Sequence, residues 1–362
     1  MSVSACQAIA LRGGWSVAQY HISLNSEPLI EGGPYVKEAV DYLKGKLNAF
    51  QKIPMSLLPT PCHRLNTISE MYGVEVFCKR DDLTGFGFGG NKTRKLDLLL
   101  AEALDHKCDT IVTSGGIQSN FCRITAAAGV YRGLSVHLVL GGLTPEKLTG
   151  NLVLDEILGA ITHFVEASGF DELEEASKKA AQELESQGRK VFRIPIGGSV
   201  PMGALAYTMA FAEILDDQER LGVTFDHIFH ASESGGTQAG LITGKLATGW
   251  QGKITGISAG TDRQTLEERV AVLANETAHL LEGHADGDAV VVDDAYIGEG
   301  YAIPTRAGRE AIQLFAEKEG IFLDHVYTGK AASGLLDWLE KGRLKGEKVL
   351  FLHTGGTPEL FA

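Results

Sequence analysis

Apolar, β-branched segments alternate with helical segments through most of this chain, and short glycine-rich turns join them. The pattern begins near Val74 and continues to the strand-like stretch KVLFLHTGG close to the C-terminal end. Alternation of this kind is typical of parallel α/β units, in which helices cover the faces of a sheet. Ligands of open α/β sheets bind at the carboxyl ends of the strands. The glycine-rich turns fall at those ends, so we expect the functional residues there.

The length of the chain favours two domains, because a single hydrophobic core rarely serves more than about 250 residues. The 362 residues contain no internal repeat and no low-complexity linker, which favours two α/β lobes that share one cleft. We expect a large domain of residues 56–95 and 203–362 and a small α/β domain of residues 96–202. Residues 1–55 are less regular, and we expect an extension of undefined role, packed on the large domain.

The charge and the cysteines argue against several classes of protein. The formal net charge is −13, which disfavours broad binding to nucleic acid or to an anionic membrane. There is no apolar run of transmembrane length and no pattern of a secretory signal. The five cysteines are scattered, and neither they nor the histidines have the spacing of metal ligands. We therefore expect a cytoplasmic protein with no catalytic metal, no nucleic-acid partner and no membrane partner.

The turn FGGNK is followed by an amphipathic helix that begins with Lys92 and carries Lys95 one turn later. The helix dipole is positive at this end, and each lysine repels the other. Both effects lower the pKa of a lysine and favour the neutral, nucleophilic amine. The alternative is a solvated lysine after a flexible turn, which this segment by itself favours because most lysines are exposed. Lys92 is thus a candidate nucleophile.

Two further strand-to-helix turns carry glycines and short polar side chains. In SGGIQSN, Ser119 and Asn120 stand at a helix start whose free N–H groups suit a carboxylate. In SESGGTQAG, residues 234–237 offer N–H groups and hydroxyls that suit a phosphate. This second turn is not a P-loop, a dinucleotide fingerprint or a nucleophile elbow. Ordinary helix caps and an unoccupied tight turn are the alternatives for these residues.

Together these features are the components of a pyridoxal-phosphate (PLP) enzyme. Five segments resemble, in order, the D-cysteine desulfhydrase and 1-aminocyclopropane-1-carboxylate (ACC) deaminase family: KRDDLTGFGFGGNKTRKL, SGGIQSN, SGGTQAG, VYTGKA and HTGGTPELF. The likeness covers roughly residues 55–362. It implies the tryptophan synthase β-like fold (fold type II), an α/β fold of two lobes with parallel-rich sheets flanked by helices. It also implies PLP as the cofactor, a small amino acid as the substrate, and a homodimer.

The resemblance further implies a role for each residue of these segments. Lys92 would bind the cofactor as a Schiff base and act as the general base. The phosphate would be held by Lys95, Ser234, Gly235, Gly236 and Thr237. The substrate carboxylate would be held by Ser119 and Asn120, with Phe121 beside them and Asn120 also near the phenolic oxygen of the cofactor. Tyr327 would lie against the ring, Tyr301 would face the substrate, and Thr354 would hydrogen-bond the pyridine nitrogen.

One position helps to choose a reaction within the family. ACC deaminases resemble one another in having glutamate directly after the tyrosine that matches Tyr327, and this chain has Thr328 there. A hydroxyl at the pyridine nitrogen leaves the ring a weaker electron sink than a carboxylate does. β-Elimination tolerates a weak sink, since electrons at Cα leave with the β-substituent. We therefore expect a PLP-dependent carbon–sulfur lyase of the D-cysteine desulfhydrase type, which releases pyruvate, ammonia and hydrogen sulfide.

Several alternatives stay open. They are a cysteate sulfo-lyase that releases sulfite, an ACC deaminase, racemisation or β-replacement on the same scaffold, and a PLP-fold protein that binds without turnover. Phe121 follows QSN where the family commonly has His or Gln, and Glu233 precedes the phosphate turn where a small residue is usual. These departures leave the stereochemistry and the leaving group of the substrate undefined.

Overall fold

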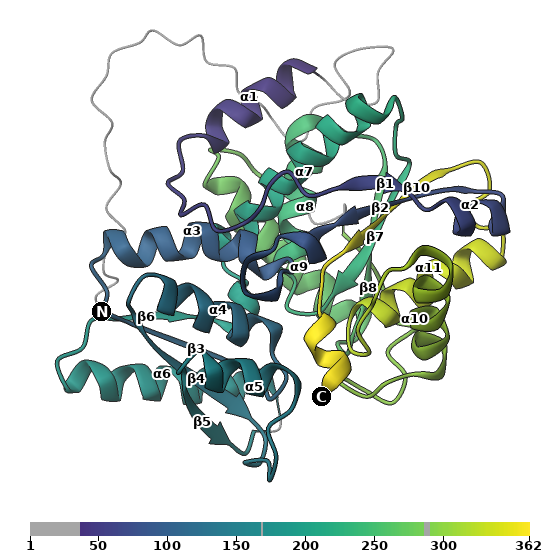
Figure 1. Ribbon diagram of the computed structural model, residues 1–362. Coiled ribbons are helices and arrows are strands. Elements are labelled where there is room, and N and C mark those ends of the chain that lie inside the picture. The colour runs from purple at the N-terminus through teal and green to yellow at the C-terminus, as the bar shows by residue number, and fades with distance from the viewer. Residues whose placement is uncertain (1–36, 168, 286–289) are drawn as a thin grey trace, which may run out of the picture.

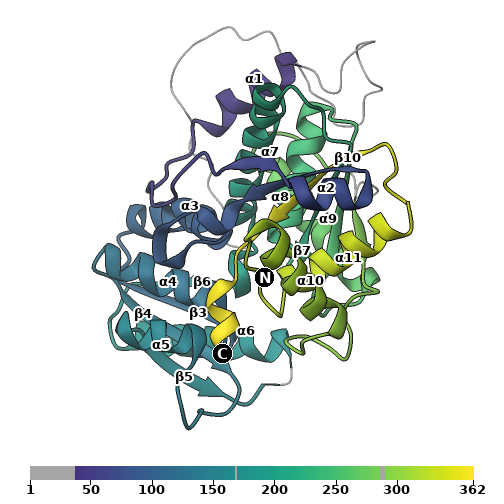
Figure 2. The ribbon, with the colours of Figure 1, turned by 45° about the vertical axis from the view of Figure 1, so that its right-hand side comes forward.

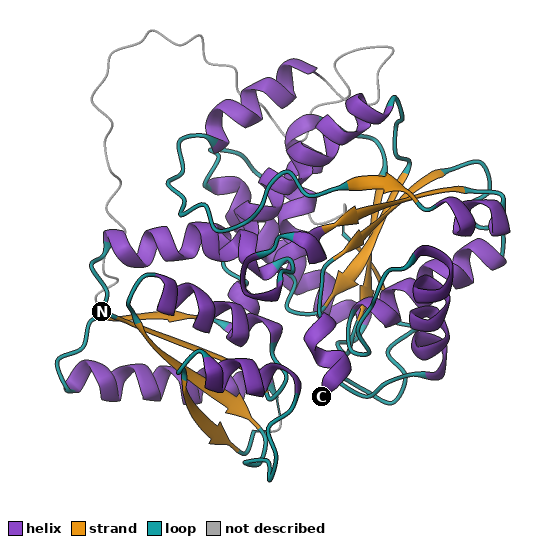
Figure 3. Cartoon of the chain, viewed as in Figure 1, coloured by secondary structure: helices purple, strands orange, loops and turns teal. Residues whose placement is uncertain are grey.

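Two separate sheets form the framework of the computed structural model, which describes residues 37–167, 169–285 and 290–362 (Figures 1 and 3). The larger sheet has the strand order β1-β2-β10-β7-β8-β9, and the smaller has the order β5-β4-β3-β6. Among the strand pairs of the described residues, β1 and β2 are antiparallel and all the other pairs are parallel. The predicted α/β fold with parallel-rich sheets is therefore confirmed.

The larger sheet places the last strand of the chain beside the first ones. Its strands are β1 (Cys62–Arg64), β2 (Glu75–Arg80), β7 (His227–Ser232), β8 (Lys253–Ser258), β9 (Val291–Asp293) and β10 (Lys348–His353). Val349 of β10 pairs with Val76 of β2 on one side and with His227 of β7 on the other. The turns after β2, β7 and β10 consequently lie next to one another at the carboxyl edge of the sheet.

Helices cover both faces of this sheet because alternate side chains of a strand point to opposite faces. Ile228 and Leu350 pack with one group of helices, and Phe229 and Phe351 pack with the other. The first group is α7 (Pro201–Leu221), α8 (Gly236–Thr248) and α9 (Arg263–His279), and the second is α2 (Asn66–Tyr72), α10 (Arg306–Glu319) and α11 (Thr328–Glu340).

The smaller sheet is covered in the same way. Its strands are β3 (Thr110–Gly116), β4 (Ser135–Gly141), β5 (Ile161–Val165) and β6 (Val191–Ile194). Ile111 and Leu138 pack with α3 (Lys92–Asp105), α4 (Asn120–Tyr131) and α5 (Gly150–Ile157), whereas Val112 and Val139 face α6 (Phe170–Ser186). The whole sheet lies between residues 96 and 202, and we retain the domain boundaries drawn from the sequence as a proposal.

Short elements connect the two lobes. Among the described residues, 3₁₀ segments lie at Asp81–Leu83, Phe86–Phe88, Ile196–Gly198 and Thr357–Phe361. The last of these follows β10 and packs against α5 of the other lobe (Figure 2). Helix α1 (Lys37–Leu47) packs on α7 and α8, while residues 1–36 of the expected extension lie outside the described residues. In the part of the chain that the structure describes, none of the helices has the length and apolar character of a membrane span.

Four elements were not expected from the sequence: α1, β1, α2 and β9. The two strands have three residues each, too few to show an alternating pattern, and they form the edges of the larger sheet. The regular strands and helices from β2 to β10 lie where the alternation predicts them, because their apolar periodicity extends over several residues.

Candidate active site

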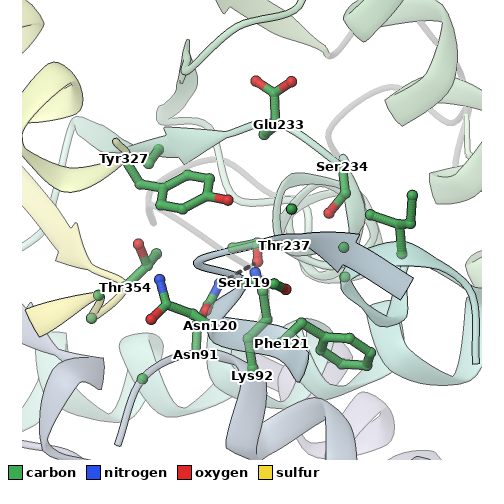
Figure 4. Close-up of a pocket in the computed structure, with 18 of the residues that line it drawn as sticks. Asn91, Lys92, Ser119, Asn120, Phe121, Glu233, Ser234, Thr237, Tyr327 and Thr354 are labelled. Atoms are coloured by element: carbon green, nitrogen blue, oxygen red, sulfur yellow. Dashed lines mark hydrogen bonds between the residues drawn. The ribbon is translucent and has the colours of Figure 1, made fainter. Parts of the chain in front are cut away.

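A cavity lies where the two lobes meet, and turns at the carboxyl ends of strands from both sheets line it (Figure 4). The turns are 89–92, 115–121, 196–197, 231–235 and 354–356. The predicted site residues come together here. Those that line the cavity are Lys92, Ser119, Asn120, Phe121, Ser234, Gly235, Thr237, Tyr301, Tyr327 and Thr354.

Helix α3 begins at Lys92, and the side chain of Lys92 points into the space bounded by Tyr327 and Ser234 (Figure 4). Burial disfavours its ammonium form and lowers the pKa of Lys92 to about 8, although the carboxylate of Asp324 partly opposes this shift. Burial, followed by repulsion from Lys92, holds the pKa of Lys95 well below its usual value. Burial is thus the largest cause of both pKa shifts, and the repulsion considered from the sequence contributes to the shift of Lys95.

Lys95 and Gly236 lie directly behind the cavity wall, where polar donors converge. Lys95 Nζ donates to the carbonyl of Gly197 over 2.9 Å, the hydroxyls of Ser199 and Ser234 are 2.8 Å apart, and the N–H of Gly236 donates to Ser199 Oγ over 3.2 Å. A Cβ atom on Gly236 would lie 2.6 Å from Lys95 Nζ. The Lys95 amine, two hydroxyls and a backbone N–H around a glycine fit the phosphate of PLP, whose negative charge would favour protonation of Lys95.

Sequence reasoning missed two residues of this region. Ser199 follows the glycines after β6, which is a signal of the same kind as the turns that were recognised. Asn91 stands next to Lys92, and its side-chain amide donates to Thr237 Oγ1 over 3.0 Å. The backbone N–H of Asn91 donates to the carbonyl of Thr354 over 2.9 Å. Asn91 therefore joins the lysine turn to the turns after β7 and β10.

The turn after β3 combines a helix cap with groups that face the cavity. Ser119 is the N-cap of α4, and its hydroxyl oxygen accepts the N–H of Cys122 over 3.2 Å, as the capping alternative expects. Asn120 lines the cavity, and its side-chain oxygen accepts from Asn151 over 3.0 Å. Phe121 is 2% exposed and packs tightly against Gly198. Asn151, like the cavity-lining Arg123, was not found from the sequence.

Two tyrosines close another side of the cavity. The phenol oxygens of Tyr301 and Tyr327 are hydrogen-bonded to each other, and the ring centroids are 6.0 Å apart. Burial raises the pKa of both phenols above the usual value, so both keep their protons at neutral pH. Phe170 of the smaller lobe contacts Tyr301 edge to face at 6.0 Å. The pair can therefore hold or donate a proton at a site shielded from water.

Glu233, which departs from the family pattern, and Thr328, which differs from the residue of ACC deaminases, are both engaged with other groups. Glu233 accepts from the hydroxyl and the N–H of Thr261 at 2.8 and 3.3 Å, and its carboxylate points away from Lys92 (Figure 4). The hydroxyl of Thr328 donates to Asp324 Oδ1 over 2.5 Å. Asp324 also accepts the backbone N–H groups of residues 326–328. Neither Thr328 nor Asp324 lines the cavity.

The site therefore offers a buried amine, a phosphate cradle and aromatic walls. These groups suit PLP, whose aldehyde, phosphate and ring need them respectively. Among residues 37–167, 169–285 and 290–362, no cluster of three or more His, Cys, Asp or Glu side chains is placed to hold a metal ion.

Comparison with known proteins agrees with this geometry. Residues 53–355 match the model of the family "Pyridoxal-phosphate dependent enzyme". A putative 1-aminocyclopropane-1-carboxylate deaminase of Pyrococcus furiosus is 42% identical over 87% of this chain and 94% of that protein. A D-cysteine desulfhydrase of Klebsiella pneumoniae is 38% identical over 87% of this chain and 97% of that protein.

A crystal structure of an ACC deaminase homologue superposes with a TM-score of 0.82 at 38% identity, over 88% of this chain and 96% of that one. These relatives cover 87 to 88% of this chain, and the family model spans residues 53–355, which include nearly all of the residues that line the cavity. The chain belongs to the pyridoxal-phosphate dependent enzyme family and is a lyase of the ACC deaminase and D-cysteine desulfhydrase type, with PLP as its cofactor.

Proposed function

We propose that this lyase catalyses α,β-elimination on a small β-substituted amino acid, with D-cysteine as the substrate. One water molecule is consumed when the elimination product is hydrolysed, and the final products are pyruvate, ammonia and hydrogen sulfide. The observation that carries this choice is the residue after Tyr327. It is Thr328, its hydroxyl is bonded to Asp324, and neither side chain lines the cavity. The hydroxyl of Thr354, which does line it, is then the group for the pyridine nitrogen, and this favours elimination over ring opening.

Each cavity residue has a task in this reaction. PLP, when bound, supplies an electron sink for the carbon that loses a proton. Lys92 binds the cofactor and takes the proton from the substrate Cα, a task that suits an amine whose pKa is about 8. Ser119 and Asn120 hold the substrate carboxylate beside Phe121 and so orient the Cα–H bond. The phosphate is held by Lys95, Ser234, Gly235, Gly236 and Thr237.

The tyrosine pair serves the leaving group. Tyr301 and Tyr327 share a hydrogen bond, and their raised pKa values keep both phenols protonated. Tyr301 donates a proton to the departing sulfur, which would otherwise leave as an anion in a site shielded from water. Tyr327 lies against the cofactor ring and holds Tyr301 in place. A cytoplasmic location, expected from the scattered cysteines, and a homodimer, implied by the family likeness, complete the proposal. Light scattering tests the dimer.

ACC deamination is the second candidate, because relatives such as the P. furiosus protein carry that name. A screen of the purified holoenzyme separates the two. Pyruvate release is measured with both enantiomers of cysteine, cysteate, serine and chloroalanine, and 2-oxobutyrate release is measured with ACC. We expect D-cysteine to react fastest. Turnover of ACC without turnover of D-cysteine would overturn the choice of D-cysteine. Release of sulfite from cysteate would instead identify a cysteate sulfo-lyase. Bound PLP without turnover of any of these amino acids would indicate a binding protein.

A further inference from the structure

A buried hydrogen-bond chain sets the orientation of a side chain in the cavity. It starts at Arg123, whose Nη1 donates to Asn151 Oδ1 over 3.2 Å. A guanidinium can only donate, so the oxygen of the Asn151 amide must face Arg123 and its NH₂ must face the other way. That NH₂ donates to the backbone carbonyl of Gln118 over 2.9 Å, and a carbonyl can only accept. Both neighbours thus define the same orientation of Asn151.

Asn151 passes this orientation on to Asn120. Its Nδ2 also donates to Asn120 Oδ1 over 3.0 Å. With its oxygen taken, Asn120 has only its NH₂ group left for the cavity that it lines. An NH₂ group directed into an anion-binding site stabilises an anionic oxygen, which here is either the phenolic oxygen of PLP or a carboxylate oxygen of the substrate.

The position of Asn151 links three turns of the site. The side chain of Asn151 is fully buried, and its backbone N–H donates to Gln118 Oε1 over 2.7 Å. Arg123 lies between Asn151 and the carbonyl of Gly89, which it reaches over 3.0 Å. Gly89 belongs to the turn that leads into Lys92. Loss of the Asn151 amide would therefore free Asn120 without removing a group that faces the cavity, since Asn151 does not line it.

We propose that Asn151 is a positioning residue that turns the NH₂ group of Asn120 toward an anionic oxygen of the bound cofactor or substrate. The proposal rests on the proposed function in so far as Asn120 acts as a donor in the cavity. It does not depend on which amino acid is turned over. Asn151 acts through Asn120 and touches neither PLP nor substrate.

The test uses Asn151→Asp in the holoenzyme, a change that preserves shape but removes the donor. The aspartate still accepts from Arg123, while its other oxygen repels Asn120 Oδ1, so Asn120 turns its oxygen to the cavity. Without substrate, the visible absorption of bound PLP is titrated with pH. Loss of a donor raises the proton affinity of an anionic oxygen, so we expect the midpoint to rise by about one pH unit if the phenolic oxygen is the partner.

Steady-state kinetics test the other candidate partner of Asn120, the substrate carboxylate. If the substrate carboxylate is the partner, the midpoint stays in place and KM rises about tenfold or more. Asn275→Asp is the matched control, because Asn275 accepts the N–H of Ala285 and a carboxylate does the same; we expect wild-type values for it. A wild-type midpoint together with wild-type KM and kcat in Asn151→Asp overturns the proposal.

The role of Asn151 can still be tested if the Asn151→Asp variant folds poorly. If Asn151→Asp does not retain PLP, Asn151→Ala, which adds no charge, is measured in the same way. Wild-type spectra and kinetics in that variant also overturn the proposal. The spectral arm needs no turnover, so an enzyme inactive on every β-substituted amino acid would refute the proposed function while this measurement still tests Asn151.

Discussion

The side-chain amide of Asn91 is hydrogen-bonded to the hydroxyl of Thr237 over 3.0 Å, so the residue next to Lys92 is tied to the turn that we propose cradles the phosphate. These residues are separated by 146 positions in the chain. The bond helps to fix the distance between Lys92 and the turn that contains Thr237. A fixed distance suits a cofactor that would be bound at Lys92 through its aldehyde and at this turn through its phosphate. The neighbouring bond from the Asn91 N–H to the Thr354 carbonyl extends this link to the turn after β10.

Asn91→Ala removes the bond to Thr237 and leaves the backbone in place. A neutral hydrogen bond contributes about 1 kcal/mol, so we expect PLP to dissociate about fivefold faster than from the wild type. Transfer of PLP to an acceptor apoenzyme gives the rate. Asn48→Ala, at an exposed position, controls for the loss of an amide. An unchanged rate would show that the Asn91–Thr237 bond does not contribute to holding the cofactor.

Lys92→Met should stabilise the cofactor-free protein at neutral pH. Burial lowers the pKa of Lys92 from 10.5 to about 8, so below pH 8 the folded state carries a buried charge at a cost. Between pH 8 and 10.5 the unfolded chain binds the proton that the folded chain has released, and wild-type stability rises with pH. We expect the Tm advantage of the variant to be largest at pH 7 and to shrink toward pH 10. The exposed Lys179→Met is the control, and an advantage independent of pH would contradict the pKa shift.

Gly236→Ala tests the phosphate cradle. The added Cβ would lie 2.6 Å from Lys95 Nζ and 2.8 Å from Ser199 Oγ, closer than real contacts allow, so one of these donors must move. We expect PLP to bind about tenfold more weakly or worse. Titration of the apoprotein with PLP measures this. Gly45→Ala, with open space around the new Cβ, should bind PLP as the wild type does. Equal affinity in Gly236→Ala would place the phosphate elsewhere.

Tyr301→Phe removes one phenol of the pair and keeps its ring. Since general acid catalysis contributes about a hundredfold or more, we expect kcat for pyruvate release to fall by about that factor while PLP stays bound. Tyr131→Phe, at a tyrosine that is 58% exposed, should leave kcat unchanged. The raised pKa values of Tyr301 and Tyr327 predict that neither phenol produces a loss of activity between pH 7 and about 9. Full activity of Tyr301→Phe would remove this residue from the mechanism.

Thr328 is the position that bears on the choice of substrate, and its hydroxyl supports Asp324. Thr328→Val removes a donor to a buried carboxylate, so we expect the free energy of unfolding to fall by about 2 kcal/mol. Thr328→Ser keeps the hydroxyl and should lose less. Thr328→Glu would place a second carboxylate beside Asp324 and should destabilise more than Thr328→Val, without conferring ACC turnover. Urea unfolding of the holoenzymes ranks them, and equal stability of the valine and serine variants would contradict the role of the hydroxyl.

Some residues of the site could be predicted from the sequence, whereas others are recognised only from their hydrogen bonds to distant residues. Lys92 and Ser234 were predicted because each stands at a glycine-rich turn that leads into a helix, and Thr354 was predicted from the family likeness. A turn signal of this kind depends only on neighbouring residues. Ser199 and Asn91 stand at similar turns, but their importance comes from bonds to Ser234 and Thr237, which no local pattern encodes.

The amino-acid sequence by itself determined the alternation of strands and helices, the edge of the sheets at which the site forms, and the family likeness that names the cofactor. These depend on periodicity and turn chemistry, which act over a few neighbouring residues. Only the tertiary structure decided that Lys92 is a buried amine, that Thr328 lies outside the cavity, that the Glu233 carboxylate points away from Lys92, and that Asn151 orients Asn120. Burial and hydrogen-bond direction are properties of contacts between distant segments, and they arise only when the two lobes close around one cavity.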